Sequence, residues 1–250
     1  MTTAQEAVEP RAARDVGIAG AARAFGVMSG GPAVLAGAAG LSILAIARAI
    51  RRRHRPSVLA VAALAALVAY LKVVRPWSRR WGATPAEVRA SLPGDETVKR
   101  PGIEMTRAVT IDAPIDDVWP WLAQIGQDRG GFYSYEWLEN LAGCELRNAD
   151  RVHDEWQHRV PGETILLHPA NGIPLARFEP PHTYAFEGWY FHLEPIDART
   201  TRLLARTRVP KGVPSAAYGV FVELPHFIME RKMLLGIKER AERARSAPTR

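Results

Sequence analysis

Two long stretches without a charged side chain lie near the N-terminus, and they constrain the fold more than any other feature. Residues 26–47 contain no charge over 22 positions, and residues 56–71 contain none over 16. A helix needs about 20 apolar residues to cross a bilayer. The first stretch meets that length, and the second meets it if the Lys72 side chain extends to the interface. The sequence therefore predicts a two-helix transmembrane hairpin over residues 26–76.

An arginine-rich link at residues 48–55 joins the two predicted spans. The alternative is a soluble helical hairpin that packs on the rest of the chain, but soluble helices rarely run so long without a charge. The link carries five positive charges and the flank at residues 72–89 also carries five, so the positive-inside rule does not decide the orientation. The free Cys144 and the absence of any disulfide partner favour a cytoplasmic domain. We expect a multi-pass protein of the cell membrane with two spans.

The positive net charge of +7 belongs to the N-terminal part alone. Residues 1–102 hold 15 Lys and Arg against 6 Asp and Glu, whereas residues 103–250 hold 18 against 20. The C-terminal part should not be attracted to phosphate backbones, so no nucleic-acid partner is expected. A single cysteine excludes a disulfide framework and any CxxC pair. We expect a flexible N-terminus at 1–25, the hairpin at 26–76, a linker with a short helix at 77–102, and a folded domain at 103–250.

The pattern of the C-terminal domain predicts its fold class. Residues 103–111 alternate apolar and polar side chains with the period of a half-buried strand. Next we expect two short helices at residues 116–125 and 135–141. Short strands should follow at 163–168, 174–179, 183–193 (two strands if broken at Gly188) and 200–209. The last element should be a long helix at 215–245, kinked at Pro225. This order predicts an α+β fold in which an antiparallel sheet wraps around the long C-terminal helix. Such a sheet leaves an apolar space where small ligands bind.

Several runs in this domain resemble the START-like proteins, the polyketide cyclase/dehydrase and lipid-transport superfamily that is also called SRPBCC. Residues 111–122 are similar to the opening strand and helix of that superfamily, and residues 126–140 and 229–234 resemble a bacterial membrane-tethered subgroup. The resemblance covers about residues 81–245. It implies a helix-grip fold around a hydrophobic cavity and, in general terms, binding of an apolar ligand. It carries over no catalytic residue.

Aromatic side chains of this domain are candidate ligand contacts. Tyr133, Tyr135 and Trp137 follow a Gly-Gly pair that suits a gating loop, so we expect them at the mouth of a pocket. Tyrosine and tryptophan offer apolar walls with polar tips that can orient a ligand. Trp156 and Trp189 are further candidates, and each of these five residues can instead belong to the core.

Arg107 is the candidate for a polar anchor inside the cavity. Its strand places it on the core face, and a buried arginine needs a partner. Glu230 is the natural partner because it lies in an apolar stripe of the C-terminal helix that begins at Phe227, and Glu187 is the other option. We therefore include these four residues among the expected ligand contacts. The pair can grip a ligand carboxylate or carbonyl, or it can be a structural ion pair.

The sequence has no motif for a metal, a nucleotide or a nucleophile. His153 and His158 are five residues apart, whereas a helical zinc site needs two histidines four apart with an adjacent glutamate. There is no P-loop, no GxGxxG after a strand and no GxSxG elbow. His226 and Glu230 are four apart and can form an acid–base pair, although a capping or surface role fits the same spacing. We expect no cofactor, no metal and no assignable catalytic residue.

The leading interpretation is a non-enzymatic, membrane-tethered domain that binds or transports a small hydrophobic ligand such as a lipid, an isoprenoid or a polyketide-like molecule. Burial of such a ligand would stabilise the complex by about 25 cal/mol per Å². The first alternative is a cyclase/dehydrase-type enzyme that acts in the same cavity. The second is a membrane scaffold whose domain binds a protein partner, and a solidly packed interior would favour it.

Overall fold

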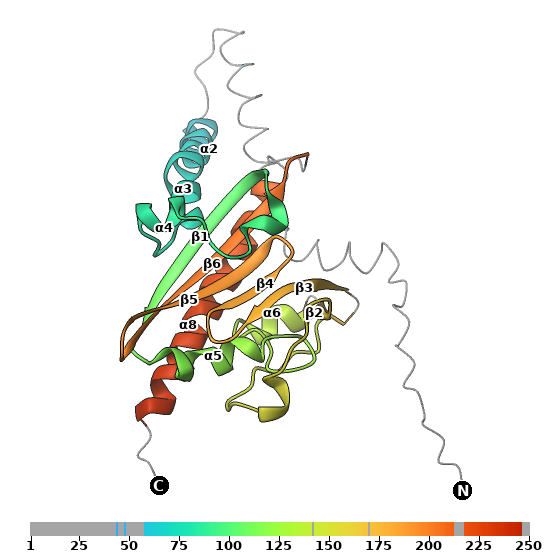
Figure 1. Cartoon of the computed structure of the whole chain (residues 1–250). Coiled ribbons are helices and arrows are strands. Elements are labelled where there is room, and N and C mark those ends of the chain that lie inside the picture. Colours follow the sequence, from blue (N-terminus) through green and yellow to red (C-terminus); the bar gives the residue numbers. More distant parts are fainter. Residues whose placement is uncertain are drawn as a thin grey trace, which may run out of the picture.

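The computed structural model of the chain describes Leu44, Arg48 and residues 58–141, 143–169, 171–212 and 218–246. The predicted flexible N-terminus and nearly all of the first predicted span lie outside these residues. The described part has an α+β fold, in which one helix projects from the end of a domain built from a sheet and helices (Figure 1). The predicted fold class is confirmed.

A six-stranded antiparallel sheet forms the domain, with the strand order β1-β6-β5-β4-β3-β2. The first and last strands are neighbours because β6 runs back along the whole length of β1. The expected break at Gly188 is confirmed, since it separates two strands that pair as a hairpin. The strands are β1 Pro101–Ile111, β2 Thr164–His168, β3 Asn171–Glu179, β4 Thr183–Phe186, β5 Trp189–Asp197 and β6 Thr200–Pro210.

The long helix α8, Leu224–Ser246, crosses one face of this sheet and closes the core (Figure 1). The expected interruption at Pro225 takes the form of a change in helix type, because a π-helical turn at Gly219–Glu223 ends directly before α8. Proline has no N–H to donate to a regular helix, so a change of hydrogen-bond pattern suits this position. The predicted apolar stripe of α8 is fully buried, and it consists of Phe227, Leu234, Ile237 and Ala241.

Short helices fill the ends of the domain and the linker. α6 (Glu136–Leu141) lies within the range predicted for it, and α5 (Ile115–Ala123) begins one residue before its predicted start. The short helix of the linker is α4, Pro85–Arg89, and it begins with a capping box. The Thr84 Oγ1 accepts a hydrogen bond from the Glu87 N–H at 3.2 Å, and the Glu87 Oε2 accepts one from the Thr84 N–H at 2.6 Å. Two orphan donors at the helix start are thereby satisfied.

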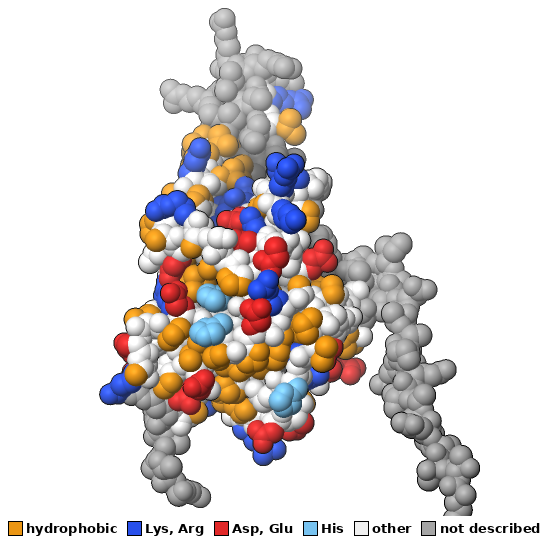
Figure 2. Space-filling view, in the orientation of Figure 1, with side chains coloured by type: hydrophobic (Ala, Val, Ile, Leu, Met, Phe, Trp, Pro, Cys, Tyr) orange, Lys and Arg blue, Asp and Glu red, His pale blue; other side chains and the backbone are white. Residues whose placement is uncertain are grey.

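The second predicted span is a helix. α2 (Val58–Ala69), a π-helical turn (Tyr70–Val74) and α3 (Arg75–Arg79) follow one another without a break. Within the described ranges this is the one helix that is long and apolar enough to cross a membrane, judged by length and composition. Figure 2 shows basic side chains gathered where it meets the domain. The orientation in the membrane stays a prediction.

The last turn of this helix packs directly on the domain. The carboxylate of Glu223 is buried and accepts hydrogen bonds from Arg75 at 3.1 Å and from Arg79 at 2.8 Å. The Trp77 ring meets the Phe227 ring edge-on, with 5.3 Å between the ring centres. The apolar helix is therefore held by charge and by apolar contact at the start of α8.

Candidate functional site

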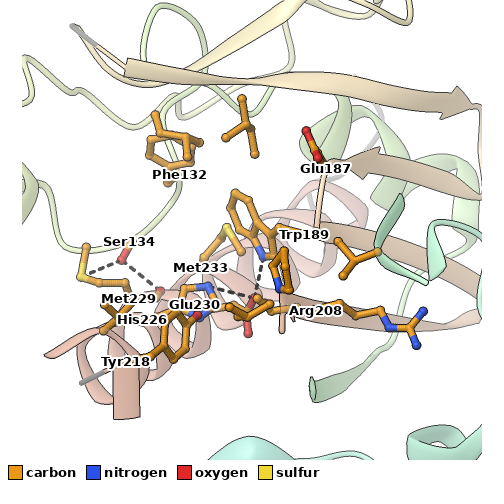
Figure 3. A pocket seen from close by; sticks show the side chains of 18 of the residues that line it. Phe132, Ser134, Glu187, Trp189, Arg208, Tyr218, His226, Met229, Glu230 and Met233 are labelled. Carbon is orange, nitrogen blue, oxygen red and sulfur yellow. Dashed lines mark hydrogen bonds and ion pairs between the residues drawn. The ribbon is translucent and has the colours of Figure 1, made fainter. Parts of the chain in front are cut away.

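A cavity of about 520 Å³ lies beside α8, and its walls come from segments far apart in the sequence. The lining includes Phe132, Leu167 of β2, Trp189 of β5, Val209 of β6 and Met233 of α8. Figure 3 shows Phe132 on the opposite side from His226 and Tyr218. Most of the lining is apolar, so the space predicted between the sheet and the long helix is present.

Helix α8 and the π-helical turn before it supply one continuous wall. The residues that line the cavity here are Val222, His226, Met229, Glu230 and Met233. Their spacing of three or four positions puts them on one face of the helix. The stripe that begins with Phe227 lies next to this face, because neighbouring helical residues are about 100° apart. Glu230 lies at the border of the two faces.

Glu230 is tied to three side chains. Its Oε2 accepts a hydrogen bond from Arg107 Nη1 at 2.5 Å, and its Oε1 accepts one from Trp189 Nε1 at 2.7 Å. The Nε2 of His226 lies 3.5 Å from the same Oε1 (Figure 3). The side chains of Arg107 and Glu230 are 0% and 1% exposed, so they form a fully buried ion pair. The prediction that these two residues pair is confirmed.

Arg107 is sealed behind this carboxylate and does not line the cavity. Its Nε donates a hydrogen bond to the Ser78 carbonyl oxygen at 2.7 Å, and its Nη2 contacts the Met105 sulfur at 3.5 Å. The guanidinium carbon lies 5.2 Å from the centre of the Phe227 ring. A molecule in the cavity therefore meets the carboxylate of Glu230 and not the guanidinium of Arg107.

Burial and neighbouring charges determine which lining groups are ionised. Burial by itself would raise the pKa of Glu230, but the Arg107 charge brings that pKa below the usual value of a glutamate. Burial lowers the pKa of His226 by more than the Glu230 charge raises it. Burial also raises the pKa of Tyr218 to about 12. At neutral pH the wall therefore presents an ionised Glu230, an uncharged His226 and a protonated Tyr218.

Glu139 is a second carboxyl group of the lining. Burial, with a smaller contribution from the Glu136 charge, raises the pKa of Glu139 to about 7. Its Oε2 is buried and has no hydrogen-bond partner among the described residues, and the same holds for Thr207 Oγ1 and His226 Nδ1. Buried polar atoms are normally paired in native proteins. These three atoms belong to lining residues but have almost no accessible surface, so a bound molecule can pair with one of them only after its side chain turns toward the cavity.

The structure brings three of the nine predicted ligand contacts to the cavity, namely Glu187, Trp189 and Glu230. Arg107 lies behind Glu230, and Phe227 packs against Trp77 in the last turn of the apolar helix. The ligand-binding role of these residues stays a prediction.

The aromatic group after the Gly-Gly pair does not line the mouth of the cavity. Tyr133 is only 1% exposed, and its hydroxyl accepts a hydrogen bond from Gln124 Nε2 at 2.8 Å. Trp137 is 68% exposed, and Tyr135 also lies outside the lining. Trp156 stacks on His153 with 4.0 Å between the ring centres, away from the cavity.

The backbone explains why Tyr133 points away. Its φ of 54° lies in the left-handed region, so the chain turns sharply at this residue. Phe132 and Ser134 on either side line the cavity, while the Tyr133 ring enters the core under α8. The arrangement needs the close approach of Gly236, where a Cβ would lie 2.4 Å from the Tyr133 carbonyl oxygen.

Other lining residues were not expected from the sequence. Met229 and Met233 could have been identified from their spacing, because together with Val222 and His226 they recur every three or four residues on one helical face. Thr207 and Tyr218 carry no such signal, since only the tertiary structure brings them to the cavity. Among the described residues, no group of three His, Cys, Asp or Glu side chains could hold a metal ion.

The sheet, the long helix and the cavity beside it define a helix-grip α+β fold, in agreement with the START-like resemblance of the sequence. No model of a known protein family matches the chain, and no curated protein matches it. Similar solved structures include the solution structure of protein BH1534 from Bacillus halodurans, with 18% identity, a TM-score of 0.32, and coverage of 56% of this chain and 95% of that one. Another is the solution NMR structure of the Polyketide_cyc-like protein Cgl2372 from Corynebacterium glutamicum, with 16% identity, a TM-score of 0.30, and coverage of 59% and 97%. These TM-scores are too low to argue from, so the assignment of the fold rests on the topology of this chain.

Proposed function

We propose that this protein binds a small apolar ligand in the cavity beside α8, next to a membrane surface. The observation that carries the proposal is the cavity, with a volume of about 520 Å³ and a mostly apolar lining. Small-molecule sites are typically cavities of about 300–1,000 Å³ with apolar walls and a few polar groups. A membrane scaffold would not need such a space.

The membrane helix supports a ligand that dissolves in the bilayer. Its foot is bound to Glu223 through Arg75 and Arg79, and the adjacent Val222 lines the cavity. The Tyr70 hydroxyl also donates a hydrogen bond to the backbone of the same π-helical turn at 3.2 Å. One wall of the cavity is thus tied directly to the anchor. The proposal includes a second span before this helix and a cytoplasmic position for the domain.

Ligand extraction tests the proposal. The full chain is purified in nanodiscs, and apolar molecules bound to it are identified by mass spectrometry against empty nanodiscs. Ile173→Trp should occupy part of the cavity that Ile173 lines, whereas Ile196→Trp changes a 56% exposed side chain outside the lining. We expect the wild type and Ile196→Trp to retain the same molecule and Ile173→Trp to lose it. Equal retention by both variants, or no specific molecule in any preparation, would contradict the proposal.

A second candidate is an enzyme of the cyclase/dehydrase type, and the carboxyl group of Glu139 favours it. A pKa of about 7 suits a general acid or base at neutral pH. The His226–Glu230 pair is less suited to proton transfer, because Arg107 and Trp189 both hold the Glu230 carboxylate. Incubation of the extracted ligand with the wild type and with Glu139→Gln distinguishes the candidates. An enzyme changes the ligand in the wild type alone, seen as a new mass after dehydration or as a new chromatographic retention time after a cyclisation that conserves the mass. A ligand unchanged in both respects rules out this candidate.

A further inference from the structure

The charged groups in the cavity lining are mostly acidic. Glu139, Glu187 and Glu230 line it, while Arg208 is the one lysine or arginine of the described residues that does. The Glu187 carboxylate lies at the exposed rim and has no ion-pair or hydrogen-bond partner among the described residues. A bound molecule therefore faces negative charge unless Arg208 or Arg107 can reach it.

Neither arginine is free to bind an anion. The Nη1 of Arg208 donates a hydrogen bond to the Asp95 carbonyl oxygen at 2.6 Å, and its Nε lies 2.8 Å from Glu104 Oε2. Figure 3 shows the Arg208 guanidinium pointing away from Trp189. Arg107 is buried behind Glu230 and uses its nitrogens inside the protein. The lining thus presents carboxylates without an exposed cation to offset them.

The unpaired polar atoms of the lining fit a neutral oxygen. They are Thr207 Oγ1, His226 Nδ1 and Glu139 Oε2, all buried and without a partner in the described part of the chain. Thr207 is only 8% exposed, so bulk water hardly reaches its hydroxyl. A hydroxyl can donate or accept, and an uncharged imidazole offers one nitrogen of each kind. A small rotation of one of these side chains, such as Thr207, would let a ligand hydroxyl or carbonyl oxygen pair with it without bringing a charge into the cavity.

Building on the proposed function, we infer that the cavity selects uncharged apolar molecules that bear a hydroxyl or carbonyl oxygen, and that it excludes anionic lipids. A buried anion would lie near Glu187 and Glu230 without a free cation, and burying an unpaired charge costs far more than burying a neutral oxygen. A plain hydrocarbon would leave the three polar atoms unpaired. The basic residues that flank the predicted spans attract anionic lipids to the membrane surface. The discrimination therefore has to occur in the cavity.

Displacement of an uncharged fluorescent probe, N-phenyl-1-naphthylamine, tests this inference on the full chain. The chain is held in nanodiscs of zwitterionic lipid at pH 8, and empty nanodiscs correct for partition into lipid. The competitors are 1-decanol, decanoate and decane, which share one chain length. We expect decanol to displace the probe at a concentration at least about tenfold lower than decanoate or decane, since tenfold corresponds to the strength of one modest polar interaction. If neither the probe nor decanol binds, the proposed function fails. If they bind but decanoate or decane competes equally well, the selectivity is wrong and the proposed function stands.

Two variants locate the discrimination in the lining. Glu187→Lys should strengthen decanoate binding and leave decanol unchanged, because it places a cation at the rim. Glu194→Lys is the matched control, since Glu194 is exposed on β5 outside the lining. Thr207→Val keeps the shape of the side chain and should bring decane closer to decanol. Decanoate binding that responds to neither Glu187→Lys nor Glu194→Lys, or responds equally to both, would overturn the assignment to Glu187. An unchanged decanol preference in Thr207→Val would remove Thr207 from the polar site.

Discussion

Replacing Arg107 with methionine is expected to destabilise the fold and not only to alter the cavity. The Arg107 and Glu230 side chains are 0% and 1% exposed and lie 2.5 Å apart. Opposite unit charges at 4 Å attract by about 4 kcal/mol at an effective dielectric constant of 20. Removing one partner of a buried pair leaves the other charge without compensation and costs about 3–5 kcal/mol. That is a large share of the roughly 5–15 kcal/mol by which a domain is stable.

The double variant Arg107→Met/Glu230→Gln isolates the contribution of the ion pair to stability from that of the surrounding contacts. It removes both charges and keeps an amide oxygen that can still accept the hydrogen bond from Trp189. Glu230→Gln alone leaves the Arg107 guanidinium buried without a counter-charge, so we expect each single change to cost about 3–5 kcal/mol and the double change to cost less than either. The implied coupling free energy is at least about 3 kcal/mol.

Urea unfolding of the full chain in detergent micelles measures these values, with tryptophan fluorescence as the signal. Arg243→Met is the control, because Arg243 and Glu239 form an ion pair with side chains 66% and 57% exposed, and such pairs contribute about 0–1 kcal/mol. If the costs of the two single changes simply add in the double variant, the two groups act independently and the reasoning is refuted. A cost of Arg107→Met no larger than that of the control would refute it as well.

Three further predictions concern the anchor, the packing of α8 and the response to acid. Glu223→Gln should loosen the apolar helix and speed hydrogen exchange in α3, whereas Glu239→Gln at an exposed pair should not; equal exchange rates in both variants would show that Glu223 does not hold this helix. Gly236→Ala should cost about 1–3 kcal/mol, because its Cβ would lie 2.4 Å from the Tyr133 carbonyl oxygen, and an unaltered urea midpoint would contradict this. The pKa of Glu230 is lowered in the folded state, so its stabilising contribution is complete above pH of about 4.3 and is lost as the pH falls further. Acid titration should therefore destabilise the wild type more steeply than the double variant, and parallel titration curves would show that Glu230 contributes nothing.

The strands, the helices and the buried ion pair were predictable because each depends on a local pattern or on one energetic requirement. The alternation in β1 places Arg107 on the buried face, and a buried guanidinium requires a carboxylate, which leads to Glu230. The break at Gly188 follows from the turn signal between two short strands. None of these inferences needs the distance between remote segments.

The cavity lining was less predictable because burial patterns show that a face is covered but not what covers it. The Tyr133 side chain is of a type that often lines ligand pockets. Its φ of 54° nevertheless turns its ring into the core and leaves Phe132 and Ser134 at the cavity. Met229 and Met233 lie on a face of α8 that could equally have met the sheet. Six of the nine predicted ligand contacts therefore lie outside the lining, three of them buried in the core.

By itself, the sequence of this protein determined two apolar stretches, an α+β order of elements and the need of Arg107 for a carboxylate, because these depend on composition, periodicity and the cost of burying a charge. Only the tertiary structure decided that the guanidinium lies behind Glu230 and that three glutamates belong to the lining of one cavity. The Arg107–Glu230 ion pair, for example, joins two residues that are 123 positions apart in the sequence. Their geometry arises when α8 packs on the sheet and is not contained in any local pattern of the chain.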